Sequence, residues 1–491
     1  MIQKLKGHTV LLMAMILSYT SFAQVKFEKV YGSTGYDYGY SVTQMYDTGY
    51  AIVGTTTSFG SGSTDMYLLR TNSLGVAIGQ KTFGGINIDQ AYSVKSTTDS
   101  GLVIAGYTNS FGFGGYDMYV VKTDKNCDTI WTKTYGGTNW DFAYSIEQTA
   151  DSGYIIAGGT YSNGSGSEDM FLVKTTSAGD TLWTKTFGGL NDDEAKSVKQ
   201  TSDGGYILTG FSKSVGDLNG DIFIVKTDNM GNMLWTYAYQ GLLDDFSYDV
   251  LEDNTGAGYI IGGETKSLAL GFQGIIIRLT TSGSLIGAST IYGAAANDGI
   301  NAISQTADGR FATMGYTNSY GAGASDFAFY LENPIGSFVR SLTYGGMRMD
   351  KGYCIKNTFD GGFIICGSSV SFSTFEHIYL IKTDSVGVSS GTVVNVLTGI
   401  GSSYANSSNS IDVFPNPANE AFSIRINEKI KSDFIVSISD ILGRTIFSKS
   451  FDARSVDEAI ILNTEQFQTG LYLINIVADN YAAKEKLIIH K

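Results

Sequence analysis

Between residues 24 and 397 the chain alternates short segments, in which every second residue is apolar, with turns rich in glycine. One stretch, Asp89–Gly137, holds four such segments: Ala91–Ser96, Leu102–Tyr107, Asp117–Lys122 and Thr129–Tyr135. Successive side chains of a strand point to opposite faces, so we expect Tyr92 and Val94 on one face and Ser93 and Lys95 on the other. The pattern predicts four antiparallel strands in this stretch.

The four-strand pattern occurs seven times along the chain. An aromatic residue followed by glycine, or by Gln-Gly in one copy, marks each unit: Tyr31, Phe83, Tyr135, Phe187, Tyr239, Tyr292 and Tyr344. The intervals between these anchors are 52, 52, 52, 52, 53 and 52 residues. A period of this length indicates stacked supersecondary units. Four strands in each of seven units predict an all-β fold, a seven-bladed β-propeller over residues 24–397.

The two ends of the repeat region complement each other. The last unit ends at Ile378–Asp384 and continues as GVSSGTVVNV, without the aromatic strand that the other units have there. The N-terminal segment Val25–Tyr31 has that pattern, with Phe27 at the position held elsewhere by Trp131, Trp183 and Trp235. We therefore expect Val25–Tyr31 to form the outer strand of the final blade and to seal the ring, which removes open sheet edges.

Beyond the repeats the composition changes twice. Residues 398–410 are dominated by Ser, Asn and Gly, which is typical of a flexible linker. Residues 411–491 return to short alternating segments: Ile411–Phe414, Phe422–Ile426, Phe434–Ile438, Ile446–Phe451, Ile460–Leu462, Leu471–Val477 and Lys486–Ile489. They predict a small Ig-like β-sandwich.

Four motifs in this C-terminal segment occur in a fixed order: Phe414-Pro415-Asn416-Pro417-Ala418, Asp440-Ile441-Leu442-Gly443-Arg444, Gly470-Leu471-Tyr472 and Lys486-Leu487-Ile488-Ile489. In order, spacing and position the segment 411–491 resembles the type A C-terminal sorting domain of the type IX secretion system. The resemblance implies a Bacteroidota protein that the type IX machinery exports from the periplasm across the outer membrane. It further implies removal of the domain, followed by release of the protein or its attachment to surface polysaccharide.

The N-terminus resembles a secretory signal peptide. Lys4 and Lys6 precede the apolar run Val10–Leu17, and Ser21-Phe22-Ala23 forms a small-x-small cleavage site. The apolar run is much shorter than the ~20 residues that cross a bilayer. We therefore expect residues 1–23 to be removed and the mature chain to lack a transmembrane segment.

Composition narrows the chemistry. The formal charge is −14, which disfavours nucleic-acid partners because an acidic surface repels phosphate. Only three histidines are present, His8, His377 and His490, too few for a zinc cluster or for much imidazole catalysis. The strand pair Asp117–Tyr135 resembles that of quinoprotein-like propeller repeats, but the residues that ligate the quinoprotein cofactor have no counterparts that we can place. No cofactor is therefore expected.

An aspartate stands six residues after the aromatic residue of every anchor. The series is Asp37, Asp89, Asp141, Asp193, Asp245, Asp298 and Asp350. A catalytic pair of carboxylates needs two unlike environments, whereas seven copies provide similar ones, so we expect a structural role in tight turns. Calcium binding is the alternative, and Asp217-Leu218-Asn219-Gly220-Asp221 has a loosely suitable oxygen spacing.

Aromatic residues decorate two loops that a propeller places on one face. The loops that enter the first strand of a unit carry Tyr36, Tyr38, Trp140 and Phe142. A loop that joins the second strand to the third carries Phe111 and Phe113. Aromatic rings beside carboxylates suit the stacking and hydrogen bonding of sugar rings or extended partners. The alternative is that they cover the blade tops as hydrophobic lids.

Two of the three cysteines, Cys354 and Cys366, lie symmetrically about a hairpin centred on Asp360. A disulfide between them is plausible in an oxidising compartment and would stabilise the blade by about 3 kcal/mol. Strand-pair geometry is often unfavourable for such a bond, which leaves two free thiols as the other outcome.

These observations favour an exported, non-catalytic binding or adhesion protein whose ligand is a glycan or a surface protein. A polysaccharide-degrading hydrolase is the first alternative, and it needs a carboxylate pair unique to one blade; the acidic loops Asp192-Asp193-Glu194 and Asp244-Asp245 are the candidates. A passive surface scaffold without any small ligand is the second alternative.

Overall fold

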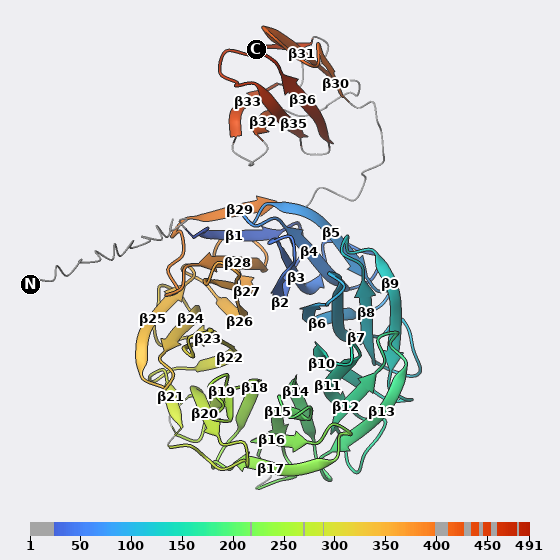
Figure 1. The fold of residues 1–491 in the computed structure, drawn as a ribbon, viewed down its shortest axis with the longest axis vertical. Coiled ribbons are helices and arrows are strands. Elements are labelled where there is room, and N and C mark those ends of the chain that lie inside the picture. The colour runs from blue at the N-terminus through green and yellow to red at the C-terminus, as the bar shows by residue number, and fades with distance from the viewer. Residues whose placement is uncertain are drawn as a thin grey trace, which may run out of the picture.

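The computed structural model describes residues 24–216, 219–268, 271–287, 289–397, 411–426, 434–440, 445–452, 459–478 and 481–491. The regular structure of these residues is entirely β-strand, in repeated and mostly four-stranded antiparallel sheets that fit a β-propeller. Figure 1 shows the repeated sheets arranged around a common centre. Within the described ranges, no helix is long and apolar enough to cross a membrane. The expected signal peptide and linker lie outside them.

Each repeat contributes one sheet, numbered here in chain order from the first to the seventh. The strands nearest the ring centre are β2 (Asp37–Gln44), β6 (Asp89–Ser96), β10 (Asp141–Gln148), β14 (Asp193–Gln200), β18 (Asp245–Glu252), β22 (Asp298–Gln305) and β26 (Asp350–Asn357). The second strands are β3 (Tyr50–Thr56), β7 (Leu102–Thr108), β11 (Tyr154–Thr160), β15 (Tyr206–Ser212), β19 (Tyr259–Thr265), β23 (Phe311–Thr317) and β27 (Phe363–Ser369).

The third strands are β4 (Asp65–Thr71), β8 (Asp117–Thr123), β12 (Asp169–Thr175), β16 (Asp221–Thr227), β20 (Gln273–Leu279), β24 (Asp326–Glu332) and β28 (His377–Thr383). The outer strands of the first six sheets are β5 (Ala77–Phe83), β9 (Thr129–Tyr135), β13 (Thr181–Phe187), β17 (Met233–Tyr239), β21 (Thr290–Tyr292) and β25 (Phe338–Tyr344). Neighbours within each of the first six sheets are consecutive in the chain, so each of these sheets is a simple antiparallel meander.

The seventh sheet is completed by the N-terminus. Strand β1 (Phe27–Gly32) pairs antiparallel with β28, and Phe27 lies opposite Lys382. Its ring meets Tyr50 edge-on, with 6.1 Å between centroids. This confirms that the N-terminal segment supplies the fourth strand of the last sheet, and a further strand that was not expected, β29 (Val393–Leu397), adds in parallel outside β1. Glu28 holds the connection: its buried carboxylate accepts hydrogen bonds from the hydroxyls of Tyr379 and Ser389.

The core of the ring lies between adjacent sheets. One cluster, for example, joins Val103 and Met118 of the second sheet to Ile146, Tyr154 and further residues of the third sheet, all of them buried. Burial of apolar side chains is the main favourable term in folding, so each sheet depends on its two neighbours.

The C-terminal segment forms two further sheets that share one apolar cluster. The first contains β30 (Ile411–Phe414), β31 (Ala421–Ile426) and β34 (Ile460–Asn463), and the second β33 (Thr445–Phe451), β32 (Phe434–Asp440), β35 (Gly470–Ala478) and β36 (Tyr481–Ile489). The side chain of Asn416 clips its turn to β36, because it donates to the Lys486 carbonyl at 2.6 Å and accepts from the Ile488 amide at 2.8 Å. Gly443 and Arg444 lie outside the described residues.

The seventh sheet should depend on its N-terminal strand. Phe27→Ala removes a buried ring at the junction with the first sheet, and we expect the free energy of unfolding to fall by about 3–5 kcal/mol. Urea denaturation measures this change. Val394→Ala in β29, where the side chain is 48% exposed, is the control and should have little effect. Equal losses in both variants would contradict the assigned role of β1.

Candidate functional site: a tyrosine-lined pocket at the ring centre

The innermost strand of every sheet contains a β-bulge at the same place. In the first sheet Gly39 pairs with Gly54 and Ser41 with Val53, so Tyr40 has no partner opposite it. Equivalent register shifts fall at Ala91/Ser93, Ala143/Ser145, Ala195/Ser197, Ser247/Asp249, Ile300/Ala302 and Gly352/Cys354. A bulge bends its strand and re-aims one side chain. The skipped residues are Tyr40, Tyr92, Tyr144, Lys196, Tyr248, Asn301 and Tyr353.

All seven bulge residues line a single pocket of about 380 Å³. They come from the strand of each sheet nearest the ring centre (Figure 1), so the pocket lies at that centre. Glu264, Tyr316 and Lys351 complete its lining. The lining residues are thus mainly phenol rings, with two ammonium groups, one carboxyl and one amide.

The tyrosines contact one another around the pocket. Tyr40 and Tyr92 stack with ring centroids 4.9 Å apart, and Tyr353 approaches Tyr40 edge-on at 5.2 Å. Tyr144 meets Tyr92 edge-on, also at 5.2 Å. Such offset and edge-on pairs hold the rings in place, which leaves part of their surface toward the cavity.

Four of the predicted contact residues extend this tyrosine cluster. Tyr38 stacks on Tyr40 with 5.9 Å between centroids, and Tyr36 stacks on Tyr38 at 6.4 Å. Phe142 lies 6.4 Å from Tyr144, and Trp140 lies 6.5 Å from Phe142. Tyr36 and Trp140 are 48% and 51% exposed, which makes them the outer members of the aromatic surface.

The other two predicted contact residues lie apart from the pocket. Phe111 contacts the ring of Tyr119 at 5.7 Å, on the third strand of its own sheet. Phe113 is 79% exposed, and none of the ring contacts among the described residues involves it. The structure therefore separates Phe111 and Phe113 from the four residues that reach the tyrosine cluster.

Charged groups on the pocket wall are paired with its rings. Lys196 forms an ion pair of 2.7 Å with Glu194, and its nitrogen lies 3.8 Å from the ring centroid of Tyr144. Glu264 accepts hydrogen bonds from the hydroxyls of Tyr248 and Tyr316, each at 2.7 Å. Burial nevertheless raises the pKa of the Glu264 carboxyl above its ordinary value.

A second buried acid lies behind the wall. Glu168 is 6% exposed; its Oε2 accepts a hydrogen bond of 3.2 Å from Tyr161, and its Oε1 has no hydrogen-bond partner in the structure. Burial, assisted by the charge of Glu194, raises the pKa of Glu168 to about 8. Its Oε1 would lie only 2.0 Å from a Cβ at position 159, so Gly159 makes room for it.

Beyond the bulge residues, lysines and acids of neighbouring innermost strands interact with one another. Lys199 pairs with Glu147 at 3.4 Å, and Asp249 accepts hydrogen bonds from the Ser197 hydroxyl and the Ile303 amide. The pKa of Lys95 falls to about 7, because Lys199 repels its charge and burial disfavours it. Charged side chains of neighbouring innermost strands therefore interact with one another here.

The seven repeated aspartates lie at the starts of the innermost strands, where they are buried. Asp141 is representative: its carboxylate accepts from the amide of Gly137 at 2.8 Å, from the hydroxyl of Ser162 at 2.7 Å and from the hydroxyl of Thr160. These partners belong to the preceding turn, to the last residue of β11 and to the loop that follows β11. These hydrogen bonds connect the turn before the innermost strand to the end of the second strand, which is a structural role. None of the seven aspartates lines the tyrosine pocket.

Two further sequence hypotheses concern metals and cysteines. Among the described residues, no group of three or more His, Cys, Asp or Glu side chains is arranged to hold a metal ion; Asp217 and Leu218 lie outside them. Cys354 and Cys366 face each other across β26 and β27 and are free thiols in the structure. Their disulfide stays a prediction.

Strand alternation alone missed the pocket. It placed Tyr92 and Val94 on one face, which is wrong, because the bulge between Ala91 and Ser93 sends Tyr92 to the pocket and Val94 into the core between sheets. The available signal was positional: the residue three places after each repeated aspartate is tyrosine in five of seven repeats.

Comparisons with known proteins identify the C-terminal segment. Residues 412–490 match the family model of the secretion system C-terminal sorting domain. The chain is also 37% identical over 81 residues to a protein of Formosa agariphila described as an endo-acting ulvan lyase, and it spans only 15% of that protein's length. The sorting domain indicates export through the type IX secretion machinery to the cell surface or the extracellular space.

Solved structures resemble the repeat region at low identity. A periplasmic gluconolactonase of Pseudomonas aeruginosa is 12% identical with a TM-score of 0.43, over 68% of this chain and 96% of the other. A protein of unknown function from Dyadobacter fermentans is 10% identical with a TM-score of 0.41, over 73% of this chain and 98% of the other. These likenesses carry no argument about activity.

The raised pKa of Glu168 predicts a pH-dependent effect on stability. As pH rises from 4.5, the ordinary pKa, to about 8, the unfolded chain releases this proton while the folded chain keeps it. Wild-type stability therefore falls across this window, by up to about 1.4 kcal/mol per pH unit. In Glu168→Gln that loss is absent, so thermal melting should show the variant gaining on the wild type as pH rises. A constant difference across the window would contradict the assignment.

Proposed function

We propose that this chain is an exported seven-bladed β-propeller that binds a glycan in the tyrosine-lined pocket at the ring centre. In this proposal residues 1–23 are a signal peptide, residues 24–397 form the propeller, residues 398–410 are a linker, and residues 411–491 are an Ig-like sorting domain. The seven repeated sheets among the described residues, the last of which includes the N-terminal strand, support the blade count.

One observation carries the proposed ligand class: the bulge residues of all seven innermost strands line one cavity, and five of them are tyrosines. Sugar rings present apolar C–H faces that stack on aromatic rings, and hydroxyl groups at their edges that hydrogen-bond to polar tips. A cavity of 380 Å³ falls within the range of small-ligand pockets. Tyr38, Phe142 and Trp140 extend the stacking surface beyond the cavity.

The alternative of a glycan-cleaving hydrolase has one specific observation in its favour. Glu168, with its raised pKa, lies near Glu194, which is paired with Lys196, and acids held in unlike environments are typical of acid–base catalysis. Binding is the better supported function because Glu168 Oε1 is fully buried behind the wall and the residue does not line the pocket. The export route would bring such a binding site to the cell surface or the extracellular space, which is compatible with a role in adhesion.

Substitution of Tyr144 tests the proposal on the full exported chain with a glycan array. We expect Tyr144→Ala to lose at least about tenfold in affinity, because the ring stacks in the pocket and supports Lys196. Tyr144→Phe keeps the ring and should retain most of the affinity. Phe113→Ala, on an exposed loop away from the pocket, is the control. Binding that survives Tyr144→Ala but not Phe113→Ala would move the site to the loops.

A further inference from the structure

Three junctions between neighbouring sheets are closed by an indole ring. Trp131, Trp183 and Trp235 stand on outer strands, each opposite a lysine of the third strand. Each ring meets a tyrosine at the start of the next sheet's second strand, with centroid distances of 5.8, 5.9 and 5.9 Å to Tyr154, Tyr206 and Tyr259. At these three junctions the indole therefore packs between one sheet and the next.

A glycine lies against each of these rings. Gly179, Gly231 and Gly283 occupy the turn after the third strand of the next sheet, with φ of 80°, 75° and 84°. A Cβ at these positions would lie 3.0, 2.7 and 2.8 Å from the neighbouring indole. The positive φ and the close approach both require glycine wherever the ring is present.

The junction between the first and second sheets departs from this arrangement at all three positions. Gly79 stands opposite Arg70 where the others have tryptophan, and Leu102 begins the second strand where the others have tyrosine. The turn position is Cys127, with φ of 67°. A non-glycine residue is disfavoured in this left-handed conformation, so its presence fits a site from which the ring is missing.

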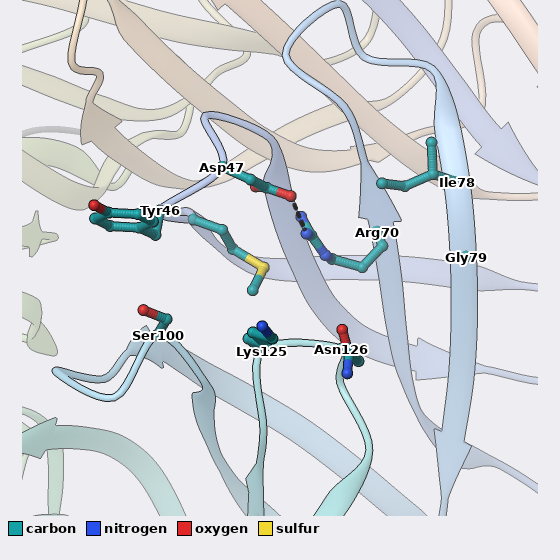
Figure 2. A pocket seen from close by; sticks show the side chains of 9 residues that line it. Tyr46, Asp47, Arg70, Ile78, Gly79, Ser100, Lys125 and Asn126 are labelled. Carbon is teal, nitrogen blue, oxygen red and sulfur yellow. Dashed lines mark hydrogen bonds and ion pairs between the residues drawn. The ribbon is translucent and has the colours of Figure 1, made fainter.

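A cavity of about 560 Å³ lies beside Gly79, where the closed junctions have the indole (Figure 2). A Cβ on Gly79 would have only the Arg70 Cβ near it, at 3.9 Å. In Figure 2 Arg70 and Ile78 lie on one side of the gap, and Lys125 and Asn126 lie across from them. Arg70 is held by Asp47 through an ion pair of 2.6 Å. Cys127 is buried in the apolar cluster shared by the first and second sheets.

We propose that this cavity, the Gly79 gap, is a binding site for a planar aromatic ring of indole size. The three closed junctions show how such a ring fits between an outer strand, a basic side chain and the next sheet. Arg278, the counterpart of Arg70 in the fifth sheet, lies 4.6 Å from the ring centroid of Phe311. Arg70 has Leu102 in place of that ring, and guanidinium groups stack favourably on aromatic faces.

The Gly79 gap is independent of the proposed glycan site. It lies at the hairpin turn that follows β2, shares no lining residue with the tyrosine pocket, and has the exposed side chains of Tyr46 and Ile78 at its rim. The ring can arrive as a free aromatic molecule or as a tryptophan side chain of another polypeptide. The rim side chains Ser100, Lys125 and Asn126 would then face the polar edge of the ligand.

Isothermal titration of the full chain with indole, and separately with N-acetyl-tryptophanamide, tests the proposal. We expect saturable binding of one equivalent of indole to the wild type. The double variant Gly79→Trp/Cys127→Gly restores the indole and the glycine of the closed junction, so it should bind at least about tenfold more weakly and melt no lower than the wild type. Trp183→Gly opens a matched gap and should add a second equivalent. Comparable binding of N-acetyl-tryptophanamide would identify a polypeptide side chain as an acceptable source; binding of indole alone would identify a free aromatic molecule.

A second measurement does not depend on the folding of any variant. Saturating indole should slow the modification of Cys127 by a small thiol reagent, followed by peptide mass mapping, and leave the rates at Cys354 and Cys366 unchanged. The proposal is overturned if the wild type binds no indole while Trp183→Gly does. It is also overturned if the folded double variant binds indole as tightly as the wild type, or if indole gives Cys127 no protection.

Discussion

Sheet-on-sheet packing is the interaction on which the rest of the structure depends. Each repeated sheet has two apolar faces, and each face is covered by the neighbouring sheet, as in the cluster that joins Val103 and Met118 to Ile146 and Tyr154. A single repeat could not bury both faces, which is the general condition of repeat architectures. The same condition explains why the N-terminal strand lies in the sheet of the last repeat. Strand β1 places Phe27 against Tyr50 of the first sheet, and this contact between the last and first sheets would be absent without β1.

The repeat separates architecture from recognition in a simple way. The innermost strand carries the same bulge in all seven repeated sheets, and the bulge turns one residue toward the ring centre. What differs is the side chain placed there, with Lys196 and Asn301 among five tyrosines. The pocket is therefore built by a uniform backbone and given its chemistry by unlike residues. The Gly79 gap follows the same logic at the periphery, where one junction lacks the indole that three others have.

Much of the fold could be predicted from the sequence because its signals are local and repeated. The innermost strands begin at the aspartates of the repeated series. Phe27 lies opposite Lys382, the position that tryptophan holds in other repeats, as the 52-residue period indicates. The outermost strand β29 could not be foreseen, since the segment GVSSGTVVNV lacks the aromatic pattern of the other outer strands and pairs in parallel.

The site was only half accessible from the sequence. Tyr36, Tyr38, Trp140 and Phe142 could be chosen because loop aromatics are conspicuous, and these four reach the tyrosine cluster. Tyr40 and its equivalents could not be assigned to the pocket by alternation, because a bulge is a property of pairing between two strands rather than of one strand's own pattern. Burial likewise decides that Glu168 keeps its proton, and burial depends on Gly159 in a neighbouring strand.

Strand β29 also has a mechanical consequence. The chain leaves the ring through this strand on its way to the C-terminal segment, so a pull on the tail loads the hydrogen bonds between β29 and β1 first. Peeling β29 away leaves β1 paired with β28, and the ring keeps its last sheet. Under tension on the tail, β29 would therefore separate first, and the pairing between β1 and β28 would remain.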